Sequence, residues 1–234
     1  MILTDLILDL LFPAKCLLCG GILETGCVDL CRNCREQTIR RPAITRRFPG
    51  IDSAHAVWYY EGSVRESLLR YKFSGKRGYA PGYGRILALS LLGQNAGAEV
   101  ITWVPVSKKR KRQRGYDQAE LLAKALGKEL GLPVVPMLRK GKDNPAQSGL
   151  TDFAARKANV RGVYTLLPGA ELRGKRILLV DDILTTGATA SECARTLKAG
   201  GAAGVCLAVM ASGRMKLQEN DTPEDLSGMA IQEK

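Results

Sequence analysis

Short apolar runs alternate along the chain with stretches in which apolar residues recur every three or four positions. The apolar runs, which predict buried strands, lie at 54–60, 99–107, 134–138, 160–166, 177–180 and 205–211. The stretches with helical spacing lie at 63–73, 79–92, 117–130 and 190–198. Strands that alternate with helices predict an α/β fold, with a mainly parallel sheet flanked by helices.

The ends of several predicted helices carry recognisable signals. Ser63 is expected to cap the helix that it opens, and Asp117 is expected to cap the helix that runs to Leu130. Gly131 and Gly200 follow the last apolar positions of two helices, where glycine commonly ends a helix.

Other segments fall outside this alternation. The first twelve residues are apolar but contain two acids and no lysine or arginine, which predicts an amphipathic helix rather than a signal peptide or a membrane span. Breakers and polar residues predict a linker at 42–52, a mobile loop at 139–149 and a disordered tail from 212. We expect a cytoplasmic protein without membrane insertion, with an N-terminal module at 1–41, an α/β domain at 52–211 and a tail at 212–234.

The run at 177–180 leads into the most informative stretch of the chain. Asp181 and Asp182 follow it, and a threonine- and glycine-rich segment then opens a helix. Glycine allows close approach of a ligand, so that amides, hydroxyls and the positive end of the helix can converge on one anion. The carboxylates suit sugar hydroxyls or a metal ion, and a phosphate beside a diol describes a ribose 5-phosphate. The candidate phosphate-binding residues are Thr185, Thr186, Gly187, Ala188 and Thr189.

An ordinary strand-to-helix turn, with an aspartate or threonine as its N-cap, is the simpler interpretation of this stretch. Such a turn needs one capping residue, whereas here two acids precede three threonines and a glycine. The segment is not a Walker A loop, because it lacks the Gly-Lys-Ser/Thr ending of that motif. We therefore favour phosphate binding.

Two Cys-x-x-Cys pairs, separated by eleven residues, lie near the N-terminus. This spacing predicts a closed, structural zinc site, whose ligands would be Cys16, Cys19, Cys31 and Cys34. A disulfide framework is the alternative, and the absence of a secretory signal argues against it. Cys27 is left over and could replace one ligand, whereas Cys193 and Cys206 are expected in the core.

The formal net charge of +12 favours polyanionic partners or phosphate-rich substrates. Six of the seven residues at 108–114 are basic, directly after a predicted strand. A solvated loop is the simpler interpretation of such a run. Its position nevertheless places it on the same edge of the sheet as 181–189, which favours a role in binding. A second basic group, made by Arg70, Lys72, Lys76 and Arg77, is interpreted as a solvated helix end.

The segment 180–189, Val-Asp-Asp-Ile-Leu-Thr-Thr-Gly-Ala-Thr, resembles the phosphoribosyl pyrophosphate (PRPP) motif of type I phosphoribosyltransferases. The resemblance implies that Asp181 and Asp182 hold the ribose 2- and 3-hydroxyls and that 185–189 holds the 5-phosphate. It also implies a pyrophosphate-binding loop at 104–107 and a mobile loop that closes over the site. The pyrophosphate candidates are Val106, Ser107 and Lys108, and the mobile-loop candidates are Arg139, Lys142 and Gln147.

The order of the motifs is similar to that of the ComF family. The cysteine pairs come first, followed by Val-Pro-Val-Ser at 104–107 with its basic run, the segment 139–159 and the 180–189 motif. This resemblance covers about 10–211. It implies a type I phosphoribosyltransferase domain with an N-terminal zinc finger, magnesium bound with PRPP, and a role in natural competence, the uptake of single-stranded DNA.

Two main hypotheses follow. In the first, the protein binds PRPP and transfers its ribosyl 5-phosphate to an unidentified acceptor, with Asp181 and Asp182 as catalytic residues and Asp182 as the closest candidate base. In the second, it is a non-catalytic competence factor with a sensory or vestigial PRPP site, which binds single-stranded DNA or a partner such as a DNA-translocating helicase. Its nucleic-acid contacts would be Lys109, Arg110, Lys111, Arg112 and Arg114. The lack of aromatic residues interleaved with these cations weakens the second hypothesis. A third and weaker hypothesis is a zinc module that recruits the domain to a complex.

Overall fold

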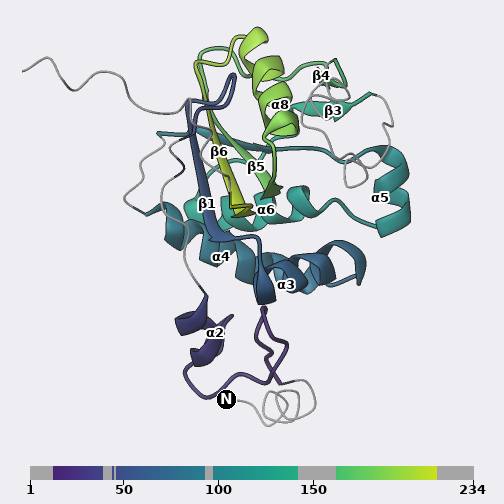
Figure 1. Cartoon of the computed structure of the whole chain (residues 1–234). Helices are drawn as coiled ribbons and strands as arrows, with labels where there is room; N and C mark the ends of the chain where they lie inside the picture. Colours follow the sequence, from purple (N-terminus) through teal and green to yellow (C-terminus); the bar gives the residue numbers. More distant parts are fainter. Residues whose placement is uncertain (1–12, 39–43, 45, 93–96, 142–161, 215–234) are drawn as a thin grey trace, which may run out of the picture.

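The centre of the fold is a sheet of four parallel strands in the order β1-β6-β5-β2 (Figure 1). The computed structural model describes residues 13–38, 44, 46–92, 97–141 and 162–214. The strands are β1 (Ser53–Tyr59), β2 (Val100–Trp103), β5 (Arg176–Leu184) and β6 (Gly204–Ser212). The predicted α/β class and mainly parallel sheet are confirmed.

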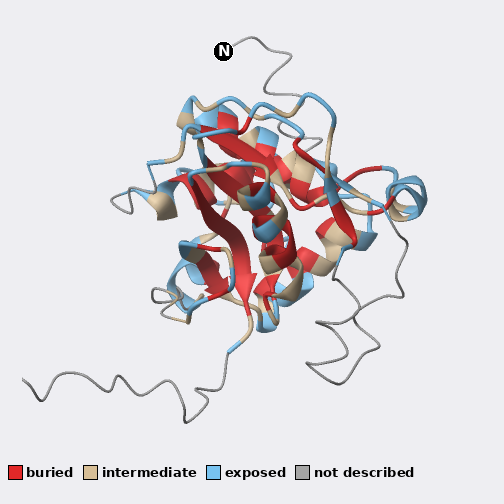
Figure 2. Cartoon of the chain, turned by 90° about the horizontal axis from the view of Figure 1, so that it is seen from above, coloured by how far each residue is buried: buried red, intermediate tan, exposed pale blue. Residues whose placement is uncertain are grey.

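Helices cover both faces of this sheet (Figures 1 and 2). On one face lie α3 (Gly62–Phe73), α4 (Ala80–Leu91) and α6 (Gln118–Leu130), and on the other lies α8 (Ala188–Ala199). Side chains of β5 alternate between the two cores, so that Leu178 and Val180 pack on the α3 side and Ile177 and Leu179 on the α8 side. This double cover explains why the central strands are almost continuously apolar in sequence.

Short elements surround the main layers. They are α2 (Arg32–Gln37), a 3₁₀ turn at Arg77–Tyr79, α5 (Lys108–Arg114) and the antiparallel pair β3 (Leu138–Lys140) and β4 (Tyr164–Leu166). Asp117 caps α6 as predicted, because its carboxylate accepts a hydrogen bond from the amide of Glu120 at 3.2 Å. Gly131 ends α6 in the left-handed conformation.

The local structure corrects some expectations. Ser63 does not cap α3, because the carbonyl of Glu61 already accepts a hydrogen bond from the amide of Arg65 and the helix begins before Ser63. The expected strand at 134–138 is reduced to a bridge between Val134 and Ile101, and the chain pairs instead from Leu138 onward. Pro136 lies between, and a proline has no amide hydrogen with which to continue a ladder.

The N-terminal cysteine segment packs against α3 and α4 rather than standing apart (Figure 1). The guanidinium of Arg70 donates to the carbonyl of Leu18, and Arg85 forms an ion pair with Asp29 at 2.6 Å. The sequence indicated a solvated helix end that includes Arg70. For Arg70 this expectation is wrong, because its guanidinium contacts the cysteine segment. The segment contributes five residues to the core that α3 and α4 share, namely Cys16, Leu17, Leu18, Leu30 and Cys34.

Several sequence expectations lie outside the described residues: the amphipathic helix at 1–12, most of the loop at 139–149, and the tail beyond 214. The tail boundary expected at 212 falls inside β6, which ends at Ser212. None of the helices within the described ranges combines the length and the apolar character that crossing a membrane requires.

Candidate active site

A cavity of about 500 Å³ lies at the carboxyl ends of β2 and β5. It is lined by the end of β5, the following loop with the start of α8, the segment 104–106, and side chains from α3, α5, β3 and β4. In open α/β sheets the ligand crevice lies at this position. The structure therefore brings together the acidic pair, all of 185–189 and the segment after β2, which were expected to share one edge.

The turn at Gly187 is built without a side-chain cap. Gly187 is the N-cap of α8, has a φ of +78°, and accepts a hydrogen bond from the amide of Ser191 at 2.8 Å. A Cβ atom at this position would lie 2.3 Å from the ring of Phe48, so the turn requires glycine for its space as well as for its φ. The hydroxyl of Thr186 accepts from the amide of Ala188 at 3.4 Å. A turn capped by aspartate or threonine, the simpler interpretation of the sequence, is therefore not what forms.

The two carboxylates of the acidic pair have different surroundings. Asp182 is 6% exposed, and the ammonium of Lys72 contacts its two oxygens at 2.9 and 3.0 Å. Asp181 is partly accessible from the cavity, and its Oδ1 accepts a hydrogen bond from the amide of Asp182 at 2.8 Å. Desolvation, followed by the charge of Asp182, raises the pKa of Asp181 well above its usual value. Asp181 thus holds a proton more readily than an ordinary aspartate does.

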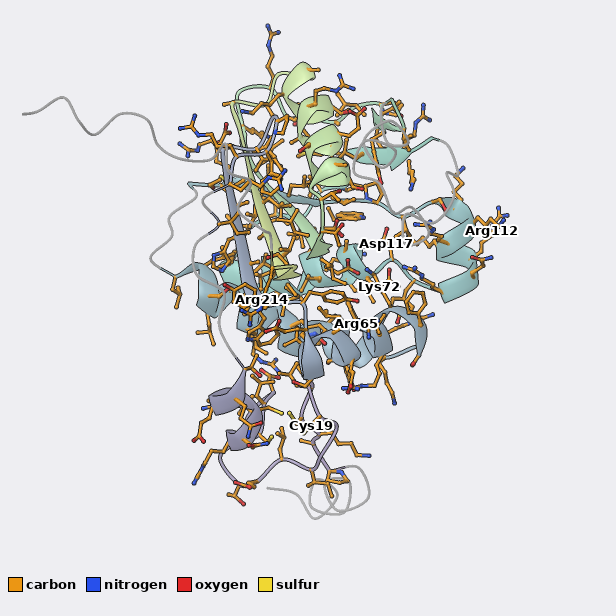
Figure 3. All side chains as sticks on the ribbon, in the orientation of Figure 1. Cys19, Arg65, Lys72, Arg112, Asp117 and Arg214 are labelled. Atoms are coloured by element: carbon orange, nitrogen blue, oxygen red, sulfur yellow. The ribbon has the colours of Figure 1, made fainter. Side chains whose placement is uncertain are left out.

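Sequence reasoning missed Lys72, which was assigned to a solvated helix end. A signal was present, because Lys72 lies four residues after Leu68 and eight after Val64, both buried on the same face of α3. A lysine on the buried stripe of a helix needs a partner, and here the partner is Asp182. Figure 3 shows Lys72 and Asp117 at the end of the sheet.

The basic run at 108–114 forms a short helix, α5, which divides its cations between two environments. Arg110 and Arg114, one helical turn apart, line the cavity. The others point outward, as Arg112 does in Figure 3, and Lys111 pairs with Glu120 at 2.7 Å. The exposed cations are Lys108, Lys109, Lys111 and Arg112.

The residues expected to bind pyrophosphate are placed differently from one another. Val106 lines the cavity, but its amide donates to a carboxylate oxygen of Asp117 at 3.0 Å. Ser107 is buried and caps α5 by accepting from the amide of Arg110 at 3.3 Å, and Lys108 is exposed outside the lining. The cations that line the cavity are Lys72, Arg110, Arg114 and Lys140.

The mobile-loop candidates are not gathered at the site within the described part of the chain. Arg139 is exposed on β3, where its Nε donates to the hydroxyl of Thr165 at 3.0 Å. Lys142 and Gln147 lie outside the described residues. The neighbour of Arg139, Lys140, is the β3 residue that lines the cavity, and its ammonium lies 5.7 Å from the ring centroid of Tyr164.

The cysteine pairs converge on one point. The four sulfurs of Cys16, Cys19, Cys31 and Cys34 lie within 4.8 Å of one another, and those of Cys19 and Cys31 are 3.8 Å apart. A tetrahedral zinc ion with Zn–S bonds of about 2.3 Å separates its sulfurs by about 3.8 Å. The amides of Gly21 and Cys34 donate to sulfurs of the cluster. The cluster therefore could hold zinc, and Cys27 is not part of it.

Comparisons with known proteins identify several relatives of this chain. A family model described as "Phosphoribosyl transferase domain" matches residues 116–226. Competence protein F of Haemophilus influenzae is 26% identical over 211 residues, which cover 80% of this chain and 92% of that protein. Competence protein ComFC of Bacillus subtilis is 26% identical over 78% of this chain and 70% of its own length. The chain is therefore similar to ComF proteins over about four fifths of its length.

Another protein similar to this chain is the DNA utilization protein YhgH of Escherichia coli, which is 25% identical over 82% of this chain and 94% of its own length. Among solved structures, a glutamine PRPP amidotransferase from B. subtilis superposes with a TM-score of 0.40 at 22% identity. That superposition covers 59% of this chain and 30% of the amidotransferase.

Proposed function

We propose that this protein is a member of the ComF family that binds PRPP in the cavity at the ends of β2 and β5, and that it transfers the ribosyl 5-phosphate of PRPP to an acceptor in a process of DNA uptake. The observation that carries the proposal is the placing of the acidic pair and the 185–189 loop in one cavity with the cations of α3, α5 and β3. The relatives named for competence and for DNA utilization support the cellular role.

In the proposed complex the loop amides and hydroxyls at 185–189 hold the 5-phosphate beside the N-terminus of α8. Asp181 and Asp182 accept hydrogen bonds from the ribose hydroxyls, which therefore compete with Lys72 for the oxygens of Asp182. Magnesium, when bound with PRPP, neutralises pyrophosphate charge, and the carboxylates of Asp181 and Asp182 are suitable oxygen ligands for it.

The transfer breaks the bond between the anomeric carbon and a pyrophosphate oxygen, which leaves with the electron pair. A new bond forms between the anomeric carbon and the acceptor, which loses a proton. Lys72, Arg110 and Arg114 line the side of the cavity where they can stabilise the departing charge. Asp181, once ionised, is the candidate in this chain to take the proton, because its raised pKa makes its carboxylate a stronger base than that of an ordinary aspartate.

Titration calorimetry with PRPP and magnesium tests the proposal. We expect binding that is lost in the double variant Asp181→Asn, Asp182→Asn, and retained in the matched variant Glu66→Gln, Glu129→Gln, which removes two exposed carboxylates outside the cavity. Ribose 5-phosphate and ATP serve as comparison ligands. Folded protein that fails to bind PRPP, or a double variant that binds as well as the parent, would contradict it.

The exposed face of α5 supports a second candidate function, binding of single-stranded DNA. Lys108, Lys109 and Arg112 are exposed and lie outside the cavity. Replacing these three with glutamine should lower the slope of the logarithm of affinity against the logarithm of salt concentration by about 2, since each phosphate contact on a single strand contributes about 0.7. The double variant of the acidic pair should leave this slope unchanged.

For the cysteine cluster we propose a structural zinc ion. Its four sulfur ligands leave no open position for a substrate, and two of them, Cys16 and Cys34, belong to the core shared with α3 and α4. The ion would therefore fix the segment that Arg70 and Arg85 hold against the domain.

A further inference from the structure

A second hollow, of about 270 Å³, adjoins the main cavity between the end of α3 and α5. We call it the α3–α5 pocket, and it is lined by Lys72, Phe73, Gly75, Arg110, Gln113 and Arg114. Four of these residues, all except Gly75 and Gln113, also line the main cavity, so the two spaces share part of their lining.

Phe73 is unusual in this pocket because its aromatic ring is largely uncovered. It is the last residue of α3 and is 65% exposed, although the other aromatic residues of α3, α4 and the turn between them are mostly buried. The guanidinium carbon of Arg114 lies 4.8 Å from the centre of the ring. A ring next to a guanidinium forms the kind of platform on which a further planar group stacks.

The charges around this ring are positive. No carboxylate pairs with Arg110 or Arg114 in the described part of the chain, and Arg114 instead donates to the side-chain oxygen of Gln118 at 3.0 Å. Burial lowers the pKa of Arg114, which indicates a guanidinium partly removed from water. A desolvated cation binds an anion more strongly than one at an open surface.

We propose that the α3–α5 pocket binds a nucleotide, with its base stacked on Phe73 and its phosphate between Arg110 and Arg114. A simple anion would make no use of the exposed ring, and an apolar ligand would leave the two guanidinium groups without a negatively charged partner. A nucleotide satisfies both requirements, whether it is free or one unit of a single strand. This binding does not require PRPP, so it goes beyond the proposed transfer.

Titration calorimetry without PRPP tests this pocket with thymidine 5′-monophosphate, inorganic phosphate and a thymidine tetranucleotide. We expect Phe73→Leu to weaken the nucleotide about tenfold and to leave inorganic phosphate unchanged, and Phe73→Trp to restore binding, since stacking needs a ring. Arg110→Gln should weaken the nucleotide and inorganic phosphate at least about fivefold. The matched variant Arg112→Gln, which removes the same charge from the outer face of α5, should change mononucleotide affinity by less than about twofold.

Each result of this experiment either supports the proposal or overturns it. If Phe73→Leu and Arg110→Gln weaken binding of the mononucleotide, the pocket binds a free nucleotide. If they weaken binding of the tetranucleotide alone, the pocket binds one unit of a single strand. Equal affinities for the parent and Phe73→Leu, equal effects of Arg110→Gln and Arg112→Gln, or no binding of either nucleotide ligand would overturn the proposal. PRPP is absent throughout, and the proposed transfer is tested separately by the calorimetry with PRPP and the acidic-pair variant.

Discussion

Lys72 on α3 contacts both carboxylate oxygens of Asp182 on β5, at 2.9 and 3.0 Å. This ion pair joins two residues 110 positions apart in sequence and leaves Asp181, the other acid of the pair, without an ion pair in the described chain. One carboxylate of the motif therefore has a cation beside it, while burial and repulsion by that carboxylate raise the pKa of Asp181.

Replacing Lys72 should destabilise the protein. Lys72→Gln leaves the carboxylate of Asp182, which is 8% exposed, without its cation, and we expect the free energy of unfolding to fall by about 1–3 kcal/mol. Urea denaturation at neutral pH measures this loss. The control is Lys76→Gln, which removes an exposed lysine near the same helix end and should cost less than about 0.5 kcal/mol. Equal losses of unfolding free energy in the two variants would show that the ion pair does not stabilise the fold.

Asp181→Asn should stabilise the folded protein at neutral pH, by about 1–2 kcal/mol. Because the pKa of Asp181 is raised in the folded state, its ionisation costs more there than in the unfolded chain. That cost is absent below the unfolded pKa of about 3.9, where the carboxyl is protonated in both states, and grows as pH rises through the folded pKa. The advantage of the variant should therefore disappear toward pH 4 in a series of unfolding curves.

Asp52→Asn should change the pH dependence of stability in the opposite direction. Although desolvation acts against it, the ammonium of Lys198 and the amide of Val205 hold the pKa of Asp52 below its usual value. This variant should lower stability at neutral pH, and the loss should vanish as the pH falls through the folded pKa. Curves of the same sign for Asp181→Asn and Asp52→Asn would contradict the assignment.

Gly187→Ala tests the packing of the phosphate loop. We expect a loss of about 3 kcal/mol or more, because a left-handed backbone costs about 1–2 kcal/mol for alanine and the new methyl group meets the ring of Phe48. Gly174→Ala is the control, since Gly174 has a similar φ of +74° with open space around it. Thermal unfolding of the two variants should separate the backbone cost from the clash, and a Gly187→Ala variant as stable as Gly174→Ala would show that the loop relaxes.

Metal analysis tests the cysteine cluster. The purified protein should contain about one zinc ion per chain, Cys19→Ser should lose most of it, and Cys27→Ser should keep it. Since Cys16 and Cys34 belong to the core shared with α3 and α4, a chelator should also lower the unfolding temperature. Zinc content that depends on Cys27 would move the site away from the four clustered sulfurs.

The chemistry that lies within one continuous stretch could be predicted from the sequence. The acidic pair and the 185–189 loop follow each other directly, so their order alone indicates their position at the end of a strand. The ion pair of Lys72 could not be predicted in this way, because only the packing of α3 against β5 brings it there. The helix at 108–114 was missed for another reason, since a run of charged residues has no apolar period. Its ends were nevertheless marked, by Ser107 as N-cap and by Gly115 in the left-handed conformation.

The place of β6 in the sheet has a consequence for how the protein is made. β6 pairs with β1 on one side and with β5 on the other, yet it is the last of the four strands to leave the ribosome. Until it emerges, the nascent chain carries two apolar strands with unpaired edges, which are surfaces prone to aggregation. The central sheet therefore closes only after the other three strands have emerged, so a stop codon before residue 204 would leave a chain that chaperones and proteases would have to deal with.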